Sequence, residues 1–196
     1  MASTAGTELK RIIFTLMSSA IKILPHYTYE DYCIWEGRWE IIDGIPFAMS
    51  PAPNPRHQWV NVNIMSEFRA AIKKAGCKNC KVYEFIDVKI EEDTIVQPDA
   101  LIVCKPIDKN FLDFPATLVV EILSPATAFK DRNSKYSLYE KMGIKYFLII
   151  DIDKKTIEIN TLENNQYRLT NYLGNSFQFL LDNDCNIDVE LNNIWE

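Results

Sequence analysis

Two short apolar runs, each with one carboxylate set into it, constrain this chain most. Residues 95–103 hold Asp99, and residues 118–123 hold Glu121. Both runs are rich in Val, Ile and Leu and are bounded by Pro and polar residues, which predicts buried strands. An ionised carboxylate in a buried strand is costly unless it is paired or bound to a metal. We therefore expect neighbouring strands whose acids share a cation; the alternative is that each acid faces solvent or meets a basic side chain.

A lysine on the helix predicted after these strands is a third candidate. Residues 132–142 have a helical pattern, with Asp131 as the expected N-cap and Gly143 just past the last turn. Lys135 lies on the face of the apolar stripe. That stripe consists of Leu138, Tyr139 and Met142. An inward lysine needs an acidic partner; the alternative is a stem along the edge of the core with its amine in water.

Five short motifs occur in one order along the chain. They are WEIIDG at residues 39–44, Ser-Pro at residues 50–51 with PRHQ at residues 55–58, QPD at residues 97–99, VEILSP at residues 120–125, and Asp131-Arg132 with Lys135 and Tyr139. Together they resemble the Uma-two family of restriction-endonuclease-like proteins, in the PD-(D/E)xK nuclease superfamily. The superfamily lysine normally stands two residues after the second acid, where this chain has Leu123. In the Uma-type pattern Lys135 takes its place.

The resemblance implies an α/β fold, with a restriction-endonuclease-like mixed β-sheet flanked by helices. It also implies that Asp99, Glu121 and the backbone carbonyl of Ile122 bind Mg²⁺ or Mn²⁺, cations that prefer oxygen ligands, and that Lys135 acts in catalysis. Glu40 is a further candidate, because it shares a strand face with Ile42 just before the Asp-Gly hairpin turn. The alternative for Glu40 is an edge-strand side chain in water.

The charge pattern leaves room for nucleic acid only locally. The net charge of −6 argues against indiscriminate binding to polyanions. Basic residues nevertheless cluster, and a basic face near the carboxylates would hold a phosphate backbone; the alternative is a solvated helix face. One such cluster is Arg69, Lys73, Lys74, Lys78 and Lys81. The candidates for DNA contacts are Arg56, His57, Lys130 and Arg132, although His57 has a purely structural alternative.

We expect a metal-dependent endonuclease that hydrolyses phosphodiester bonds in DNA. Three alternatives remain open: a nucleic-acid-binding module without turnover, a dimeric interaction scaffold, and, less well supported, a glycosidase with paired acids. The resemblance suggests a homodimer.

The length suits a single domain over residues 1–196. We expect an amphipathic helix in residues 1–24, the endonuclease-like core in residues 28–160 and extra strands in residues 161–196. The apolar run near the start is too short and too interrupted to span a bilayer, so we expect a cytoplasmic protein without membrane contact. Five cysteines, an odd number, favour a reducing compartment over a disulfide scaffold. The Cys77–Cys80 spacing suits zinc or redox chemistry, but we interpret it as a chance pair in a turn.

Overall fold

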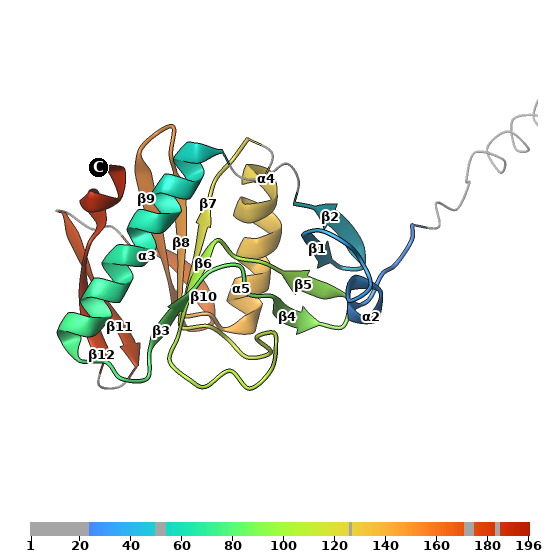
Figure 1. Ribbon diagram of the computed structural model, residues 1–196, viewed down its shortest axis with the longest axis horizontal. Helices are drawn as coiled ribbons and strands as arrows, with labels where there is room; N and C mark the ends of the chain where they lie inside the picture. Colours follow the sequence, from blue (N-terminus) through green and yellow to red (C-terminus); the bar gives the residue numbers. More distant parts are fainter. Residues whose placement is uncertain (1–23, 50–53, 126, 171–174, 183–184) are drawn as a thin grey trace, which may run out of the picture.

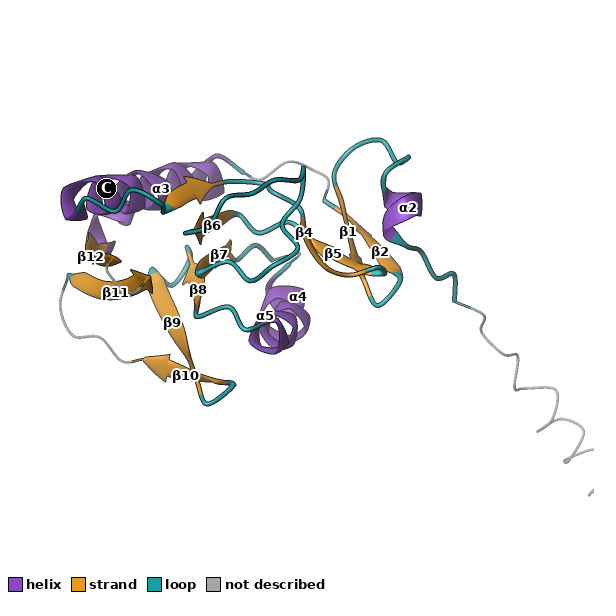
Figure 2. Cartoon of the chain, turned by 90° about the horizontal axis from the view of Figure 1, so that it is seen from below, coloured by secondary structure: helices purple, strands orange, loops and turns teal. Residues whose placement is uncertain are grey.

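A computed structural model describes residues 24–49, 54–125, 127–170, 175–182 and 185–196. The helix expected in residues 1–24 therefore lies, apart from Leu24, outside the described residues. The described chain forms a mixed β-sheet flanked by helices, as predicted. Figure 2 shows α3 on one face of this sheet and the α4–α5 segment on the other.

The central sheet has six strands in the order β10-β9-β8-β7-β6-β3. Their bounds are β3 Lys81–Tyr83, β6 Ala100–Val103, β7 Leu118–Ile122, β8 Tyr146–Asp151, β9 Thr156–Glu163 and β10 Gln166–Thr170. Neighbours are antiparallel except β7 and β8, which run parallel. A parallel pair needs a crossover connection, and the helical segment between these two strands supplies it. The middle of the sheet is consequently covered on both faces.

Helix α3 (Pro55–Ala75) covers one face. Asn54 caps its start by accepting a hydrogen bond from the His57 backbone N–H, and Gly76 ends it in the left-handed region at φ 71°. Both ends agree with the sequence rules for helix caps. Phe68 and other α3 side chains pack against the side chains of β7 that include Val120. Burying each such side chain contributes about 1.5–3 kcal/mol.

The opposite face is covered by one continuous helical stretch of three parts. These are α4 (Ala128–Lys130), the π-helical turn η1 (Asp131–Lys135) and α5 (Tyr136–Met142). Thr127 is the residue before its first turn, so the predicted N-cap at Asp131 is wrong. The sequence pattern for the helix start was ambiguous because Thr and Asp are both favoured N-cap residues. In the structure Thr127 holds this position, without a side-chain cap hydrogen bond. The predicted end at Gly143 is confirmed, with φ 84°.

A smaller antiparallel sheet has the order β2-β1-β5-β4. Its strands are β1 Trp39–Ile42, β2 Ile45–Ala48, β4 Val88–Glu91 and β5 Thr94–Val96, and the short helix α2 (Tyr29–Tyr32) precedes it. The single strand predicted at residues 95–103 is wrong, because β5 lies in this sheet and β6 in the central one. Pro98 stands at the break, where its missing N–H suits a residue outside a strand ladder. Residues 97–99 therefore link the two sheets.

The C-terminal part packs on α3 and includes the hairpin of β11 (Ser176–Asp182) and β12 (Cys185–Glu190), then the 3₁₀ turn η2 (Leu191–Trp195) (Figure 1). One disulfide, Cys77–Cys185, joins β12 to the turn after α3. The other, Cys80–Cys104, joins the residue before β3 to the residue after β6. The expectation of unpaired cysteines and a chance pair in a turn is therefore wrong. Only the fold brings together cysteines that are 108 and 24 residues apart in the sequence.

In the described ranges, no helix is long and apolar enough to cross a membrane.

Candidate functional site

The two predicted acids lie on neighbouring segments, with Asp99 just before β6 and Glu121 near the end of β7. The antiparallel register pairs Ala100 with Val120, so Asp99 lies beside Glu121 on the neighbouring strand. Asp99 Oδ2 also accepts a hydrogen bond of 2.8 Å from the Ile122 backbone N–H. Along β7, Val120 and Ile122 face α3, so Glu121 faces the helical stretch that carries Lys135.

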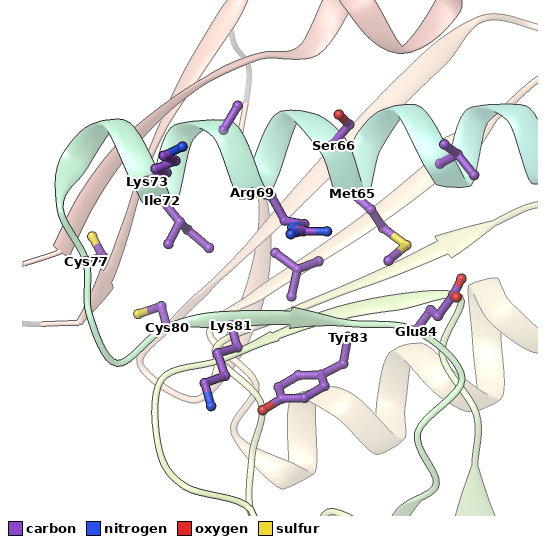
Figure 3. A pocket seen from close by; sticks show the side chains of 13 residues that line it. Met65, Ser66, Arg69, Ile72, Lys73, Cys77, Cys80, Lys81, Tyr83 and Glu84 are labelled. Carbon is purple, nitrogen blue, oxygen red and sulfur yellow. The ribbon is translucent and has the colours of Figure 1, made fainter.

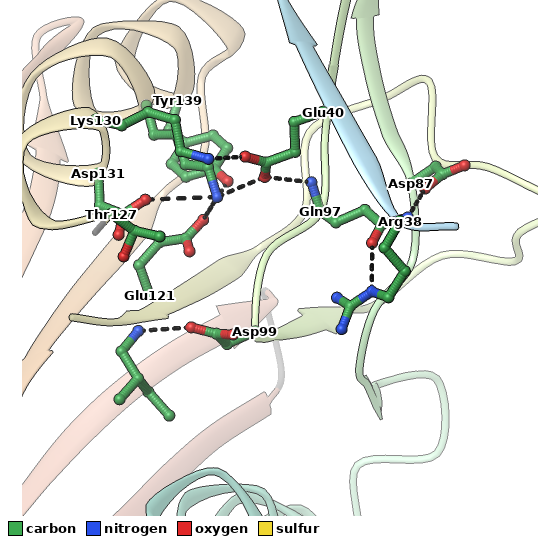
Figure 4. A network of polar contacts seen from close by, with 12 residues as sticks. Arg38, Glu40, Asp87, Gln97, Asp99, Glu121, Thr127, Lys130, Asp131 and Tyr139 are labelled. Carbon is green, nitrogen blue, oxygen red and sulfur yellow. Dashed lines mark hydrogen bonds and ion pairs between the residues drawn. The ribbon is translucent and has the colours of Figure 1, made fainter. Parts of the chain in front are cut away.

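Lys135 contacts three acids, Glu40, Glu121 and Asp131, which Figure 4 shows close to one another. Its Nζ is 2.7 Å from Glu40 Oε1, 2.8 Å from Glu121 Oε1 and 3.6 Å from Asp131 Oδ1. The lysine is only 2% exposed, which rules out the alternative of an amine in water. It ends the π-helical turn η1, a distortion that is often found at functional sites.

Glu40 reaches this cluster from the small sheet. It is completely buried, which rules out an edge-strand side chain in water. Its Oε1 accepts a 2.9 Å hydrogen bond from the Gln97 backbone N–H, and its Oε2 pairs with Lys130. Residues of both sheets and of the helical stretch are thus tied to one another through Glu40 and Lys135.

The lysine and Glu40 are held in their charged forms. Burial by itself would lower the pKa of Lys135, but Glu121, Glu40 and Asp131 raise it well above its usual value. Burial by itself would raise the pKa of Glu40, but Lys135 and Lys130 outweigh burial and lower it. An opposite charge within a few ångströms favours ionisation in this way.

The other two acids behave differently. Burial raises the pKa of Glu121 well above its usual value, and the neighbouring carboxylates add to the effect against the opposing charge of Lys135. Burial likewise raises the pKa of Asp131, with Lys135 opposing. The cluster therefore has more acid than its basic groups neutralise. A further cation would relieve this imbalance by keeping Glu121 and Asp131 ionised.

His57 closes the site from the first turn of α3. Its Nε2 lies 3.3 Å from Asp99 Oδ2 and 3.1 Å from the Ile122 carbonyl oxygen. Burial by itself would lower the pKa of His57, but the hydrogen bond and charge of Asp99, with the Ile122 carbonyl, raise it. His57 therefore contacts two of the oxygens that the family resemblance assigns to a metal.

These oxygens fit a hard divalent cation. Asp99, Glu121 and the Ile122 carbonyl offer oxygen donors only, as Mg²⁺ and Mn²⁺ prefer. Asp131 Oδ1 is buried without a hydrogen-bond partner among the described residues. Within the described chain, no three His, Cys, Asp or Glu side chains are placed to hold a metal ion by themselves. Asp99, Glu121 and the Ile122 carbonyl would be the protein ligands, with waters completing the coordination.

The four residues predicted to contact DNA lie around this site but have protein partners. Arg56 is the most exposed of them, and it donates to the Ile152 carbonyl at 3.0 Å. Arg132 forms two 2.8 Å hydrogen bonds with the carboxylate of Glu158. Lys130 is paired with Glu40, and His57 is buried. Their role in DNA binding stays a prediction.

The basic cluster that begins with Arg69 and Lys73 on α3 lies away from the carboxylates. Arg69 and Lys73 are 12 and 16 residues beyond His57 on α3, which places them roughly 18–24 Å along the helix axis. With Lys81 they line an open pocket of about 870 Å³ at the other end of α3 (Figure 3). This cluster therefore does not form a face beside Asp99 and Glu121, contrary to the expectation.

Two members of the site were not among the predicted site residues. Asp131 was assigned to a cap, although it precedes Lys135 by four residues and so shares its helix face. Tyr139 is fully buried and donates a 2.7 Å hydrogen bond to Glu121 Oε1. Its place in the apolar stripe hid this polar role. A buried tyrosine hydroxyl normally needs such a partner, and that rule would have identified it.

Comparisons with known proteins agree with this architecture. The uncharacterized protein slr1290 of Synechocystis sp. is 30% identical over 125 residues, which is 59% of this chain and 63% of that protein's length. The chain thus aligns with less than two thirds of this curated relative. A crystal structure titled as a putative nuclease belonging to DUF820, from Anabaena variabilis, matches with a TM-score of 0.68. That match covers 86% of this chain and 97% of the other at 13% identity, so it shows the fold alone.

A family model also matches most of the chain. It spans residues 28–192, and its printed description is "Putative restriction endonuclease". The matched region extends past residue 160 and includes β10, β11 and β12. The protein is therefore a member of the Uma2 family.

Proposed function

We propose that this protein is a metal-dependent endonuclease that hydrolyses phosphodiester bonds in DNA. The observation that carries the proposal is the convergence of three predicted groups: Asp99 and Glu121 on adjacent strand ends, and Lys135 Nζ 2.8 Å from Glu121. Paired carboxylates beside an ammonium group suit phosphoryl transfer, in which negative charge must be neutralised at the phosphate. The family description gives independent support for a nuclease.

In this proposal Asp99, Glu121 and the Ile122 carbonyl would hold Mg²⁺ or Mn²⁺. When bound, the ion supplies Lewis-acid activation of water and charge neutralisation at phosphate. His57 contacts the Asp99 and Ile122 oxygens from the first turn of α3, so it would orient these two donors beside the ion. Lys135 keeps its proton, because three acids surround it, and provides positive charge for the developing phosphorane. Glu40 holds the lysine in position through its 2.7 Å contact.

The test is cleavage of plasmid and linear DNA by purified protein, with Mg²⁺, with Mn²⁺ and with chelator. The variants are Asp99→Asn and Glu121→Gln, which preserve size. We expect metal-dependent cleavage that falls by at least about a hundredfold in either variant, since even outer-shell partners of metals cost 10–100-fold. Glu163→Gln, which removes an exposed acid of β9 paired with Arg168, is the matched control and should cleave like the parent protein.

One observation favours a second function, a nucleic-acid-binding module without turnover. Lys135 is almost fully buried and already contacts three carboxylates, which removes it from direct contact with a substrate. This reading predicts DNA retention in a gel-shift assay without cleavage under any metal condition. Binding that is unchanged in Glu121→Gln would favour it, whereas cleavage that disappears in the same variant would exclude it.

A further inference from the structure

The four cysteines of the two disulfides form a single group, which we call the cysteine cluster: Cys77, Cys80, Cys104 and Cys185. They come from four places in the fold, namely the turn after α3, the residue before β3, the residue after β6 and the first residue of β12. The sulfur of Cys80 is 3.7 Å from the sulfur of Cys185, which belongs to the other disulfide. The two disulfides are therefore in contact.

This distance is informative because it joins two sulfurs that are not bonded to each other. In a tetrahedral zinc site with Zn–S bonds of about 2.3 Å, neighbouring sulfurs are roughly 3.8 Å apart. Cys77 and Cys80 also have the two-residue spacing that is common in structural zinc sites, with two further cysteines supplied by distant segments. The fold thus gathers four cysteine ligands, and one non-bonded sulfur pair already has the separation found in a zinc site.

We propose that the reduced cysteine cluster binds one Zn²⁺ through its four thiolates, so that the cluster exchanges between two disulfides and a tetrahedral zinc site. In the disulfide form no thiolate is available, which agrees with the absence of a ready metal-ligand group in the described chain. The proposal does not depend on the nuclease assignment. Thiolate sulfur selects zinc, whereas the oxygen-lined site around Asp99 selects magnesium or manganese.

The exchange balances with a dithiol as the reductant. Two equivalents of dithiol deliver four electrons and four protons, which break the two S–S bonds and give four thiols, while each dithiol becomes a cyclic disulfide. Zinc then displaces the four thiol protons to solvent and takes up four thiolates. An oxidant of the disulfide class reverses the sequence and releases the ion.

The surroundings of the cluster suit both steps. Cys77 and Cys104 are partly exposed, which gives an attacking thiolate access to one sulfur of each disulfide. Figure 3 shows the sulfurs of Cys77 and Cys80 at one end of the 870 Å³ pocket, which offers the ion a path from solvent. Lys73 and Lys81 line the same pocket, and their charges oppose the net negative charge of four thiolates around one divalent ion.

The experiment uses the full-length protein, reduced with a dithiol, equilibrated with a low concentration of Zn²⁺ and freed of excess metal. Elemental analysis should find roughly one zinc per chain, the stoichiometry of a four-thiolate site. Co²⁺ in place of Zn²⁺ should give the visible absorption of tetrahedral cobalt thiolate. After oxidation the zinc should be gone, and the mass of the chain should be lower by four hydrogens.

Three variants decide the assignment. Cys33→Ser removes the exposed cysteine outside the cluster and should keep the zinc. Cys80→Ser should weaken zinc binding by at least about tenfold, since it removes a ligand. Cys104→His cannot form the disulfide but keeps a zinc ligand, so it should retain the ion even if Cys80→Ser fails to fold. The proposal is overturned if the reduced parent protein holds no zinc, if Cys80→Ser holds as much as Cys33→Ser, or if folded Cys104→His holds none.

Discussion

The two ends of α3 carry two clusters that are built in opposite ways. At its first turn His57 contacts Asp99 beside a group of buried charges. Just past its last turn Cys77 belongs to the cysteine cluster. Both clusters draw on segments that are far apart in the sequence. The charged cluster is held by ion pairs, which weaken when a carboxylate is protonated. The sulfur cluster is held by covalent bonds, which a reductant breaks.

This difference shows what each cluster is sensitive to. A group of buried charges is stable only as a complete set, because an unpaired charge in the interior is far more costly than the pair. A disulfide stabilises mainly by constraining the unfolded chain and is broken by reduction. The first end of α3 should therefore respond to charge and pH, and the second to redox state and metal.

The largest effect is expected from Lys135→Met. The change leaves Glu40 and Glu121 buried without their shared amine, and breaking a buried pair in this way costs about 3–5 kcal/mol of unfolding free energy. Urea unfolding at neutral pH measures it. Lys141→Met, which removes an exposed lysine of the same helical stretch, is the control and should change stability little. Equal losses of unfolding free energy in the two variants would contradict the expectation that the buried pairs of Lys135 matter more than the exposed pair of Lys141 with Glu91.

An intermediate effect is expected at the other end of α3. Loss of one disulfide in the presence of a chelator should lower the unfolding free energy by about 2–4 kcal/mol, the usual range for a single bond. The loop closed by Cys77–Cys185 spans 108 residues, so this bond should account for the larger share. The double variant Cys77→Ser with Cys185→Ser, compared with Cys33→Ser, separates the two bonds by thermal unfolding. A reduced protein as stable as the oxidised one would contradict the expectation that the disulfides stabilise this end of α3.

A smaller, pH-dependent effect is expected from His57→Gln. Because the folded-state pKa of His57 is raised, its protonation stabilises the fold fully below the unfolded pKa of about 6.5. This contribution is lost as the pH rises through the raised folded value. The difference in unfolding free energy between parent and variant should be about 1.5–3 kcal/mol at acidic pH, as for hydrogen bonds to charged groups.

The measurement is urea unfolding of both proteins across the pH range, with chelator present so that no metal competes for Asp99. His26→Gln serves as the control, because His26 is exposed. A difference between parent and His57→Gln that grows with pH would have the wrong sign and would refute the interpretation of the Asp99 contact.

Local rules predicted several parts of the fold correctly. Asn54 and Gly76 bound α3, and the Asp43-Gly44 pair forms the hairpin turn with φ values of 50° and 74°. Each of these features depends on a few adjacent residues, so the sequence contains the whole cause. The neighbouring strands of Asp99 and Glu121 were also predicted, because ionisable groups in short apolar runs are rare enough to stand out.

The parts that the sequence did not reveal depend on contacts between distant segments. The break at Pro98 divides a run that looks continuous, and only pairing with β1 on one side and β7 on the other shows it. The cysteine pairing is of the same kind, since spacing cannot decide which sulfurs meet. Asp131 was misassigned because an acid one turn before a buried lysine has the same sequence pattern as a helix cap.

The short link at residues 97–99 has a mechanical consequence. Glu40 belongs to the small sheet, Glu121 belongs to the central sheet, and Lys135 joins them from the helical stretch between. A rigid rotation of the small sheet about this link would pull Glu40 away from both lysines and leave Glu121 in place. The contacts of Glu40 with Lys130 and Lys135 therefore depend on the angle between the two sheets.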